Sequence, residues 1–475
     1  MYLSPPLLRR ALAIFDERSG AMKGNADAYY IKMTTTPVSK LIISLGIPTT
    51  VSMLVTSIYN MADTYFVGML GESPQAATGI LFTLQAIIQA VSFMLGNGSG
   101  AMASKELAAK NRDGASDYVS TSFFMGISIG LIIAVLGLIF LEPFMKLLGS
   151  TDTILPYAKQ YGFWVLVACP FMVCSIVLNN NLRFEGSSFY AMIGLGFGGL
   201  LNIAGDYLLV YVYKMGIWGA GLSTAVSQMI SFGLLLLFYF KKAQGKISIK
   251  FVSKSIGIYT TILRVGFPSL IRQSVTSISN GLFNNLTKPF GDAAIAAMSI
   301  VNRIAMFIMC VGLGMGQGYQ PVSSFNYACG KYDRVKKGLI FTMCFGLCLI
   351  GGMGVICFIF ADPLVSLFQK SAEVREIAII ALRFATIGVL FHPFSLPINM
   401  LYQSILQTKT ASFLSLLRSG LVFIPVMLIA RYTLGLTGIQ IAQSLSDVIV
   451  GLISIIYIVR FMKNTPDTSP ELAEE

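Results

Sequence analysis

Three aspartates lie inside long apolar stretches of this sequence, where charged side chains are rare. Of the 22 acidic residues, Asp63, Asp206 and Asp447 are the ones that fall within such stretches away from a loop. A charge at the centre of a membrane-spanning helix costs about 2.5 to 3.5 kcal/mol on insertion scales, so such a residue usually faces a polar cavity, pairs with another group or titrates. The three aspartates are therefore the first candidates for chemistry, either binding a cation or carrying a proton.

Asp63 and Asp206 are predicted to lie at one depth together with Asn202 and Thr224. Asp63, Asp206 and Thr224 are each eight residues from the nearest outer loop, which places them about 12 Å below the outer surface at about 1.5 Å per residue. Asn202 precedes Asp206 by four residues and so shares its helix face. These side chains could hold Na+ through oxygen ligands or share a proton between coupled acids. Ordinary hydrogen bonding between helices is the alternative for each of them.

Further polar residues are candidates for a substrate cleft. Tyr59 and Asn60 share the helix face of Asp63. Asp447 lies at nearly the same depth in the second half of the chain, where it could attract a cationic substrate or pair with an intramembrane arginine. Such arginines could extend to the membrane surface, pair or line a cavity, and the sequence has four of them: Arg272, Arg303, Arg383 and Arg418.

The composition shows what kind of protein positions these residues. Of 475 residues, 55% are hydrophobic and 12% are charged, and the mean hydropathy is +0.72, which is too apolar for a soluble domain and predicts an integral membrane protein. A cytoplasmic N-terminus places most of the 34 Lys and Arg in cytoplasmic tails and loops. The net charge of +12 is thereby explained without nucleic acid as a partner. The seven cysteines lack CxxC spacing, which favours packing over metal or disulfide chemistry.

Twelve apolar segments are long enough to cross the membrane, and an even number returns the C-terminus to the cytoplasm. The predicted segments are 38–69, 74–101, 118–141, 156–180, 188–212, 216–240, 259–287, 292–318, 335–360, 375–404, 410–433 and 438–461. The chain is therefore predicted to be an all-α polytopic membrane protein with 12 transmembrane helices.

The two halves of the chain repeat each other at an offset of 220 residues. LGIP at 45–48 matches VGFP at 265–268 at this offset, and farther on the glycines at 96, 98 and 100 match those at 314, 316 and 318 at an offset of 218. Because the offset spans six helices, the repeats are parallel and form two pseudo-twofold-related six-helix bundles with a cleft between them. The predicted organisation is a cytoplasmic N-terminal extension, an N-terminal lobe, a basic cytoplasmic linker, a C-terminal lobe and a cytoplasmic tail, at 1–37, 38–240, 241–258, 259–461 and 462–475.

Prolines, the histidine and the chain ends suggest further features. Pro48 and Pro268, each early in the first helix of its half, predict either a fixed kink or a moving hinge. His392, the single histidine, is a candidate for handling a proton. The segment Leu7 to Phe15 is either a basic amphipathic helix on the membrane surface or a disordered tail, and no signal peptide is expected. The acidic segment 465–475 is predicted to be disordered.

Taken together, these motifs resemble the multidrug and toxic compound extrusion (MATE) family, in its prokaryotic branch of MepA-like pumps. The resemblance covers nearly the whole of residues 38–461. It rests on Pro48 with DTYFVG at 63–68, Asn202 spaced four residues before Asp206, the Gly216 helix start with Thr224, and the glycine-rich ends of the second and eighth helices. Some members carry an acidic residue in the seventh helix. This chain has Thr276 at that position and Arg272 nearby.

The resemblance implies a two-lobed, V-shaped antiporter that exports amphipathic, often cationic drugs in exchange for H+ or Na+. Its coupling site would be Asp63, Asn202, Asp206 and Thr224, with ion binding linked to bending at Pro48. Incoming cations would compete with a cationic drug for the negative charge. We expect no organic cofactor, no metal other than Na+ at the coupling residues, small amphipathic molecules and membrane lipids as partners, and a monomer in a prokaryotic cytoplasmic (inner) membrane.

Other functions are less well supported by the sequence. A flippase of lipid-linked or polysaccharide precursors would share the architecture, and it would need a more cationic cleft, to which the four arginines could contribute. A membrane enzyme would need a metal-binding acidic pair or a cluster of His and Glu, and the single histidine argues against one. A channel fits poorly, because a twofold repeat with acids in one half suits alternating access better than a continuous pore.

Overall fold

The structure, a computed structural model, describes residues 27–368 and 371–466, and within these residues every regular element is a helix. The predictions for Leu7 to Phe15 and for residues 467–475 lie outside the described residues. The described part of the N-terminal extension is a short helix at 27–35, which the sequence did not predict. This helix is held against the bundle, because Tyr29 is buried and donates a hydrogen bond to the backbone oxygen of Phe184 at 3.2 Å.

The first lobe follows the predicted segments. Its helices are α2 (Val38–Gly68), α3 (Glu72–Ala108), α4 (Arg112–Ile139), the short α5 (Leu141–Leu147), α6 (Leu155–Phe184), α7 (Ser188–Asp206) with the π-helical turn η1 (Tyr207–Val212), and α8 (Gly216–Lys242). A short 3-10 turn, η2 (Ile249–Phe251), lies in the linker to the second lobe.

The second lobe repeats this order. Its elements are α9 (Ile256–Thr287), η3 (Lys288–Phe290), α10 (Asp292–Ala328), α11 (Tyr332–Ile359), α12 (Ala361–Ser366), α13 (Ala372–Val389), α14 (His392–Ser404), α15 (Thr408–Leu416), the π-helical turn η4 (Leu417–Leu421), α16 (Phe423–Leu434) and α17 (Leu436–Asn464).

Each predicted span corresponds to a helix or to a broken helix in the described chain. Ten are long and apolar enough to cross a membrane as single spans, and α13 with α14 forms an eleventh that bends by 48°. The twelfth, α9, has 32 residues and is more polar, carrying Arg264, Arg272 and Asn280 along its length. Both α2 and α9 continue as single helices through their internal prolines, Pro48 and Pro268.

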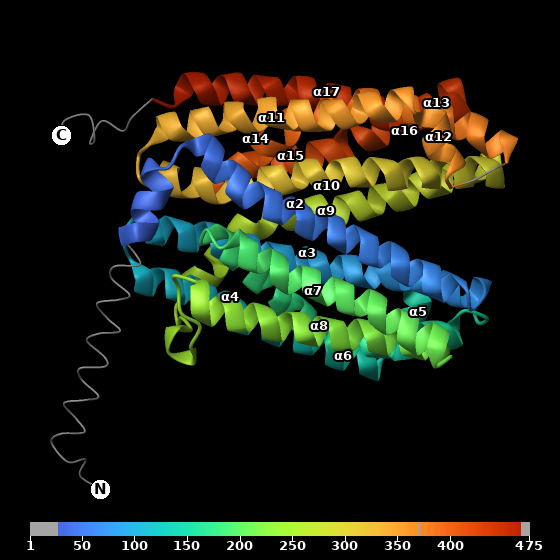
Figure 1. Cartoon of the computed structure of the whole chain (residues 1–475), viewed down its shortest axis with the longest axis horizontal. Coiled ribbons are helices and arrows are strands. Elements are labelled where there is room, and N and C mark those ends of the chain that lie inside the picture. Colours follow the sequence, from blue (N-terminus) through green and yellow to red (C-terminus); the bar gives the residue numbers. More distant parts are fainter. Residues whose placement is uncertain (1–26, 369–370, 467–475) are drawn as a thin grey trace, which may run out of the picture.

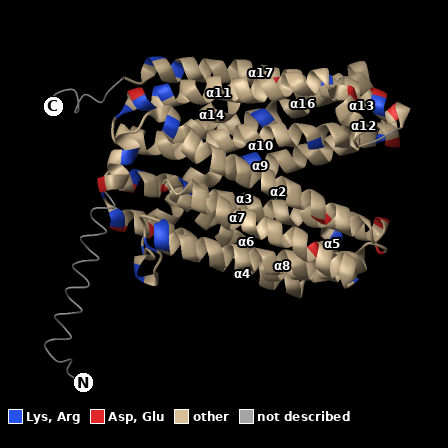
Figure 2. Cartoon of the chain, viewed as in Figure 1, with Lys and Arg blue, Asp and Glu red and all other residues tan. Residues whose placement is uncertain are grey.

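The two lobes form a V (Figure 1). They lie close together at the end where α2 begins and α17 finishes, and they diverge toward the other end. Lys and Arg gather at the closed end of this V, and the helix walls between the two ends are mostly uncharged (Figure 2). The described molecule therefore has the two-lobed, V-shaped architecture that the repeat and the family resemblance predicted.

The repeated glycines explain how the lobes meet. The helix α3 packs along α9, and in the symmetry-related contact α10 packs along α2. A Cβ atom on Gly98 would lie 2.1 Å from the backbone oxygen of Ile262, and one on Gly318 would lie 2.4 Å from the Cα of Gly46. Neither distance leaves room for a side chain, so glycine is needed for the backbones to approach this closely.

The cysteines pack less uniformly than predicted. All seven are free thiols. Cys169, Cys174 and Cys310 are buried, as a packing role requires. Cys344 and Cys348 are exposed on α11, so the prediction that the cysteines serve packing is wrong for these two. Their sequence context is apolar because the helix surface faces lipid, and an apolar run alone does not separate a lipid-facing side from a buried one.

Candidate functional site

A hydrogen-bonded chain links four helices of the first lobe around Asp63. The side chain of Asp63, only 3% exposed, accepts a hydrogen bond at Oδ2 from the Tyr161 hydroxyl of α6 at 3.0 Å. The same hydroxyl lies 3.3 Å from Oγ1 of Thr224 on α8, which in turn accepts from Nδ2 of Asn202 on α7 at 3.2 Å. The structure thus brings Asp63, Asn202 and Thr224 together, and it adds Tyr161, which the sequence analysis missed.

Asp206 completes this group from the last residue of α7. Its side chain is fully buried, and its charge and that of Asp63 interact. The hydroxyl of Ser223 is nearby but donates to the backbone oxygen of Asn202 at 3.0 Å. The π-helical turn η1 begins directly after Asp206, and such irregular turns are frequent at functional sites.

Several oxygens of this group have no hydrogen-bond donor within the described chain. They are Oδ1 of Asp63, both carboxylate oxygens of Asp206 and Oδ1 of Asn202. Burying a carboxylate without a partner is expensive, because an unpaired charge loses its hydration. A bound proton or an oxygen-coordinated cation such as Na+ would remove that cost. The site is chemically suited to either, and its role in coupling stays a prediction.

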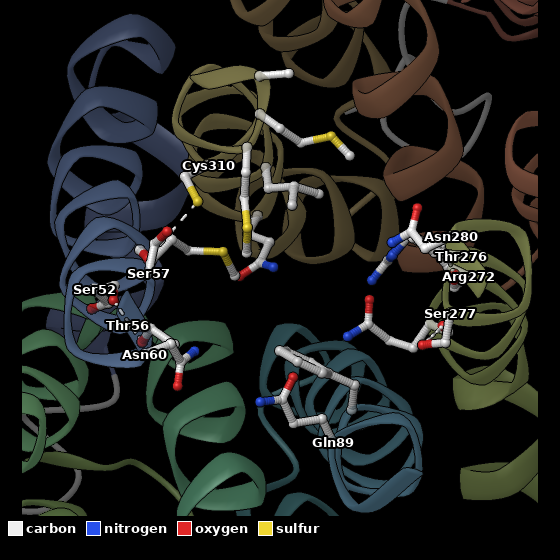
Figure 3. Close-up of a pocket in the computed structure, with 18 of the residues that line it drawn as sticks. Ser52, Thr56, Ser57, Asn60, Gln89, Arg272, Thr276, Ser277, Asn280 and Cys310 are labelled. Carbon is white, nitrogen blue, oxygen red and sulfur yellow. Dashed lines mark hydrogen bonds between the residues drawn. The ribbon is translucent and has the colours of Figure 1, made fainter. Parts of the chain in front are cut away.

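A cavity of about 560 Å³ lies between the lobes and is lined by residues of both (Figure 3). Tyr59 and Asn60 of α2 line it, as does Asp447 of α17. Much of the remaining lining is apolar and rich in methionine: Met53, Phe93, Met172, Ile176, Leu195, Met306, Met309 and Leu313. Flexible thioether and aromatic side chains of this kind adapt to apolar molecules of different shapes.

The coupling residues and the cavity are separate. Asp63, Asn202, Asp206 and Thr224 are not among the described residues that line the cavity. An ion at the carboxylates and a molecule in the cavity would therefore not contact the same atoms, so competition between them for the negative charge would act through its electric field. That competition stays a prediction. Connection through α2 remains, because Asn60 and Asp63 are three residues apart on that helix.

Asp447 sits in a compensated charge cluster. Its Oδ2 lies 3.1 Å from Nε2 of His392 and accepts a hydrogen bond from Nε2 of Gln443 at 3.0 Å. Nε of Arg418, in the turn η4, lies 3.9 Å from the other carboxylate oxygen. Of the two alternatives for Asp447, pairing with an intramembrane arginine is the one present in the structure. His392 belongs to this cluster, since its Nε2 is also 3.3 Å from Nη2 of Arg418.

The other intramembrane arginines differ in their surroundings. Arg272 lines the cavity, and its one hydrogen bond in the described chain goes to Oδ1 of Asn399 at 3.5 Å. Arg303 and Arg383 are exposed and are not among the described residues that line the cavity. The guanidinium of Arg383 stacks on the Phe358 ring at 5.7 Å from its centroid. Two of the four arginines, Arg272 and Arg418, therefore face the cavity.

A fifth arginine, Arg183, was missed because the predicted fourth segment ended at residue 180, whereas α6 continues to Phe184. Arg183 is only 1% exposed and donates to Oδ1 of Asn97 at 2.9 Å and of Asn180 at 2.7 Å. It also donates to the side-chain oxygens of Gln317 and Gln320 on α10. Arg183 of α6 is thereby hydrogen-bonded to α10 of the second lobe, where Gln317 also lines the cavity.

Two repeated six-helix lobes around a central cavity define the class of membrane transporters built from internal repeats. The MatE family model matches residues 48–208 and 268–429, one stretch in each lobe, starting at Pro48 and at Pro268. The chain belongs to the MatE family, and the resemblance predicted from its motifs is confirmed.

Curated relatives and solved structures agree with this assignment. The multidrug export protein MepA of Staphylococcus aureus is 27% identical over 459 residues, covering 94% of this chain and 98% of its own. MepA of Staphylococcus saprophyticus is 25% identical over 446 residues, covering 91% and 96%. An outward-facing multidrug resistance MATE family transporter has the same fold, with a TM-score of 0.86 at 24% identity over 91% of this chain and 99% of that one.

Proposed function

We propose that this protein is a secondary active exporter of amphipathic organic compounds, driven by the entry of H+ or Na+ at Asp63, Asn202, Asp206 and Thr224. The observation that carries this proposal is the set of buried carboxylate and amide oxygens in the first lobe that have no hydrogen-bond donor in the described chain. The methionine-rich cavity between the lobes supports an amphipathic cargo. The names of the MepA relatives support multidrug export.

Ion binding and cargo binding would be coupled through movement of the helix α2, and the ion would not displace the cargo by direct contact. A proton or Na+ on Asp63 and Asp206 removes an unpaired buried charge, and it can favour one state of the transporter only if the two states bind the ion with different affinities. Asp63 shares α2 with the cavity residues Tyr59 and Asn60. Pro48, which lacks a backbone N–H and weakens the helix locally, is the proposed hinge for the movement of α2.

The proposed orientation places both ends of the chain in the cytoplasm of a prokaryotic cell. Lys and Arg gather at the end of the molecule where α2 begins (Figure 2), and such a bias marks the cytoplasmic side of membrane proteins. The wide end of the V would then face outward. The protein would act as a monomer in the cytoplasmic membrane, with its whole cargo path inside one chain.

Transport by purified protein in liposomes tests this proposal. Efflux of a fluorescent drug is measured with a pH gradient and a sodium gradient imposed separately. The wild type should respond to at least one gradient, and Asp63→Asn should remove that response. Asp333→Asn, which changes an exposed aspartate paired with Lys337, serves as the control. Gradient-driven efflux by Asp63→Asn near the wild-type rate would eliminate the proposed coupling site.

A flippase for lipid-linked or polysaccharide precursors is the second candidate function. The observation that favours it is the presence of Arg272 and Arg418 in the cavity wall, since a pyrophosphate head group needs cationic partners. A lipid-flipping assay on the same liposomes separates the two functions. The sequence analysis expects a cationic cargo, and this stays a prediction. Which charge the cargo carries depends on the charged residues of the cavity wall.

A further inference from the structure

The cavity wall of the second lobe carries a guanidinium whose charge is not balanced. Arg272 of α9 lines the cavity and makes one long hydrogen bond, to the amide oxygen of Asn399 at 3.5 Å. Asp447 is the only acidic residue among the described lining residues, and it pairs with His392 and Arg418. Because a guanidinium has five N–H donors, most of the hydrogen-bonding capacity of Arg272 is directed at no described protein group.

The charges nearest to Arg272 make this imbalance larger. Its electrostatic neighbours are other cations, Arg418 in η4 and the buried Arg183 of α6. The terminal nitrogens of Arg183 donate to neutral amide oxygens and its Nε has no hydrogen-bond partner, so no hydrogen-bonded carboxylate offsets its charge within the described chain. Three arginines, Arg183, Arg272 and Arg418, therefore lie in or near the cavity wall together with a single aspartate among the described lining residues, Asp447.

Polar side chains beside Arg272 would complete a pocket for an anion. Thr276 and Asn280 follow it at successive turns of α9, and Figure 3 shows them with Ser277 on one side of the cavity, facing Asn60 and Gln89 across it. The amide of Asn280 can donate hydrogen bonds to oxygens. The hydroxyl of Ser277 donates to the backbone oxygen of Gln273 at 3.0 Å in this structure and could turn toward a bound oxygen by rotating about its side-chain bond. The apolar part of the same molecule would contact the methionines on the rest of the wall.

From this arrangement we infer that Arg272, with Ser277 and Asn280, forms a subsite for the anionic head group of an amphipathic cargo, such as a carboxylate, sulfonate or phosphate. A planar guanidinium can bind two oxygens of such a group at once, which a neutral side chain cannot do. The inference rests on the proposed function, because it takes the cavity to be the cargo site. It specifies the class of cargo as amphipathic organic anions and not cations.

Three pyrene probes that share one apolar body test the inference: pyrenebutyrate, the neutral pyrenebutanol and the cationic pyrenebutyl-trimethylammonium. Their binding to the purified full-length protein in detergent is measured by fluorescence anisotropy against protein-free micelles. We expect the wild type to bind pyrenebutyrate at least about tenfold more tightly than the cation, the order of one charge-assisted hydrogen bond. Equal or tighter binding of the cation by the wild type would overturn the inference, and this comparison needs no variant.

Two variants of Arg272 test whether this residue causes the preference for the anionic probe. Arg272→Gln should lower the affinity for pyrenebutyrate by about tenfold and leave that for pyrenebutanol unchanged, whereas Arg272→Lys should keep part of the preference because it keeps the charge. Arg383→Gln is the matched control, since Arg383 stacks on Phe358 and is not among the described lining residues. A preference that survives Arg272→Gln would contradict the assignment to Arg272.

Further measurements distinguish a soluble anionic ligand from a lipid head group, and they separate failure of the subsite from failure of the proposed export function. Displacement of bound pyrenebutyrate by octanoate would assign the subsite to soluble amphiphiles, and displacement by phosphatidylglycerol alone would assign it to a lipid head group. Tight binding of pyrenebutyrate without gradient-driven efflux of any probe would refute the proposed export function and leave the subsite standing. Gradient-driven efflux of the cationic probe with no binding of pyrenebutyrate would refute the subsite alone.

Discussion

The two lobes share one fold and differ in how they hold charge. In the first lobe, Asp63 and Asp206 carry buried oxygens that receive no hydrogen bond from the described chain. In the second lobe, Asp447 is paired with the cationic Arg418 and with His392, and only its Oδ1 lacks a hydrogen-bond donor in the described chain. The π-helical turns lie beside these charges in both lobes, η1 directly after Asp206 and η4 around Arg418. Both lobes therefore carry a π-helical turn beside a buried acid, and our proposal assigns ion uptake to the acids of the first lobe.

The largest predicted effect is the difference in ion-driven efflux between a variant that lacks an acid of the first lobe and one that lacks the acid of the second. Asp206→Asn should reduce gradient-driven drug efflux in liposomes to the level of protein-free vesicles, because the amide cannot be protonated and binds cations weakly. The variant should also melt at a temperature no lower than the wild type, since it removes a buried charge without a partner. Efflux that still follows the ion gradient in Asp206→Asn would break the proposed division between the lobes.

The matching change in the second lobe should affect stability more than coupling. Asp447→Asn leaves Arg418 and His392 without a carboxylate partner, and breaking a buried ion pair from one side costs about 3 to 5 kcal/mol. The measurement is thermal unfolding in detergent, followed by gradient-driven efflux of the folded fraction. We expect a clearly lower melting temperature with coupling retained. An unchanged melting temperature would show that the cluster is not a stabilising pair.

Where the lobes are equivalent in structure, matched substitutions should have matched effects. Gly98→Ala and Gly318→Ala each place a methyl group into a close backbone contact between lobes, and overpacking of this kind costs about 1 to 3 kcal/mol. Gly233→Ala is the control, because nothing lies within 4 Å of the added Cβ. Similar losses of melting temperature for the first two variants are expected, and a loss for one lobe only would show that the contacts are not equivalent.

The smallest predicted effect concerns the hydroxyl that links Asp63 to Thr224. Tyr161→Phe keeps the ring and removes the donor to Asp63, so the free energy of ion binding should change by about 1 kcal/mol, the net value of a typical hydrogen bond. In liposomes this corresponds to a shift of several-fold in the ion concentration that half-saturates efflux, with the maximal rate kept. No shift would place Tyr161 outside the coupling group.

The sequence was sufficient to predict the fold and the main polar residues for a simple physical reason. Polar residues are costly in lipid, so Asp63, Asp206 and Asp447 are conspicuous within apolar runs. The repeat was equally visible, because close backbone contacts between the lobes require glycine in both halves, as at Gly98 and Gly318.

Other features could not be read from the sequence. Tyr161 resembles any aromatic residue of a membrane helix until its hydroxyl is seen against Asp63. Arg183 resembles a loop residue, because the apolar run ends before the helix does. Counting residues gives depth along a helix but not the direction in which a side chain points. The separation of Asp63 from the cavity, and the position of Arg272 inside it, therefore required the structure.

Ion uptake by the purified protein tests the central claim most directly. Proton uptake is followed with a pH indicator and sodium binding with radioactive Na+, for the wild type, Asp63→Asn/Asp206→Asn and Asp447→Asn in nanodiscs. We predict saturable uptake of at least one of the two ions by the wild type and by Asp447→Asn, and none by the double variant. Uptake by the double variant equal to that of the wild type, or its loss in Asp447→Asn alone, would contradict the account.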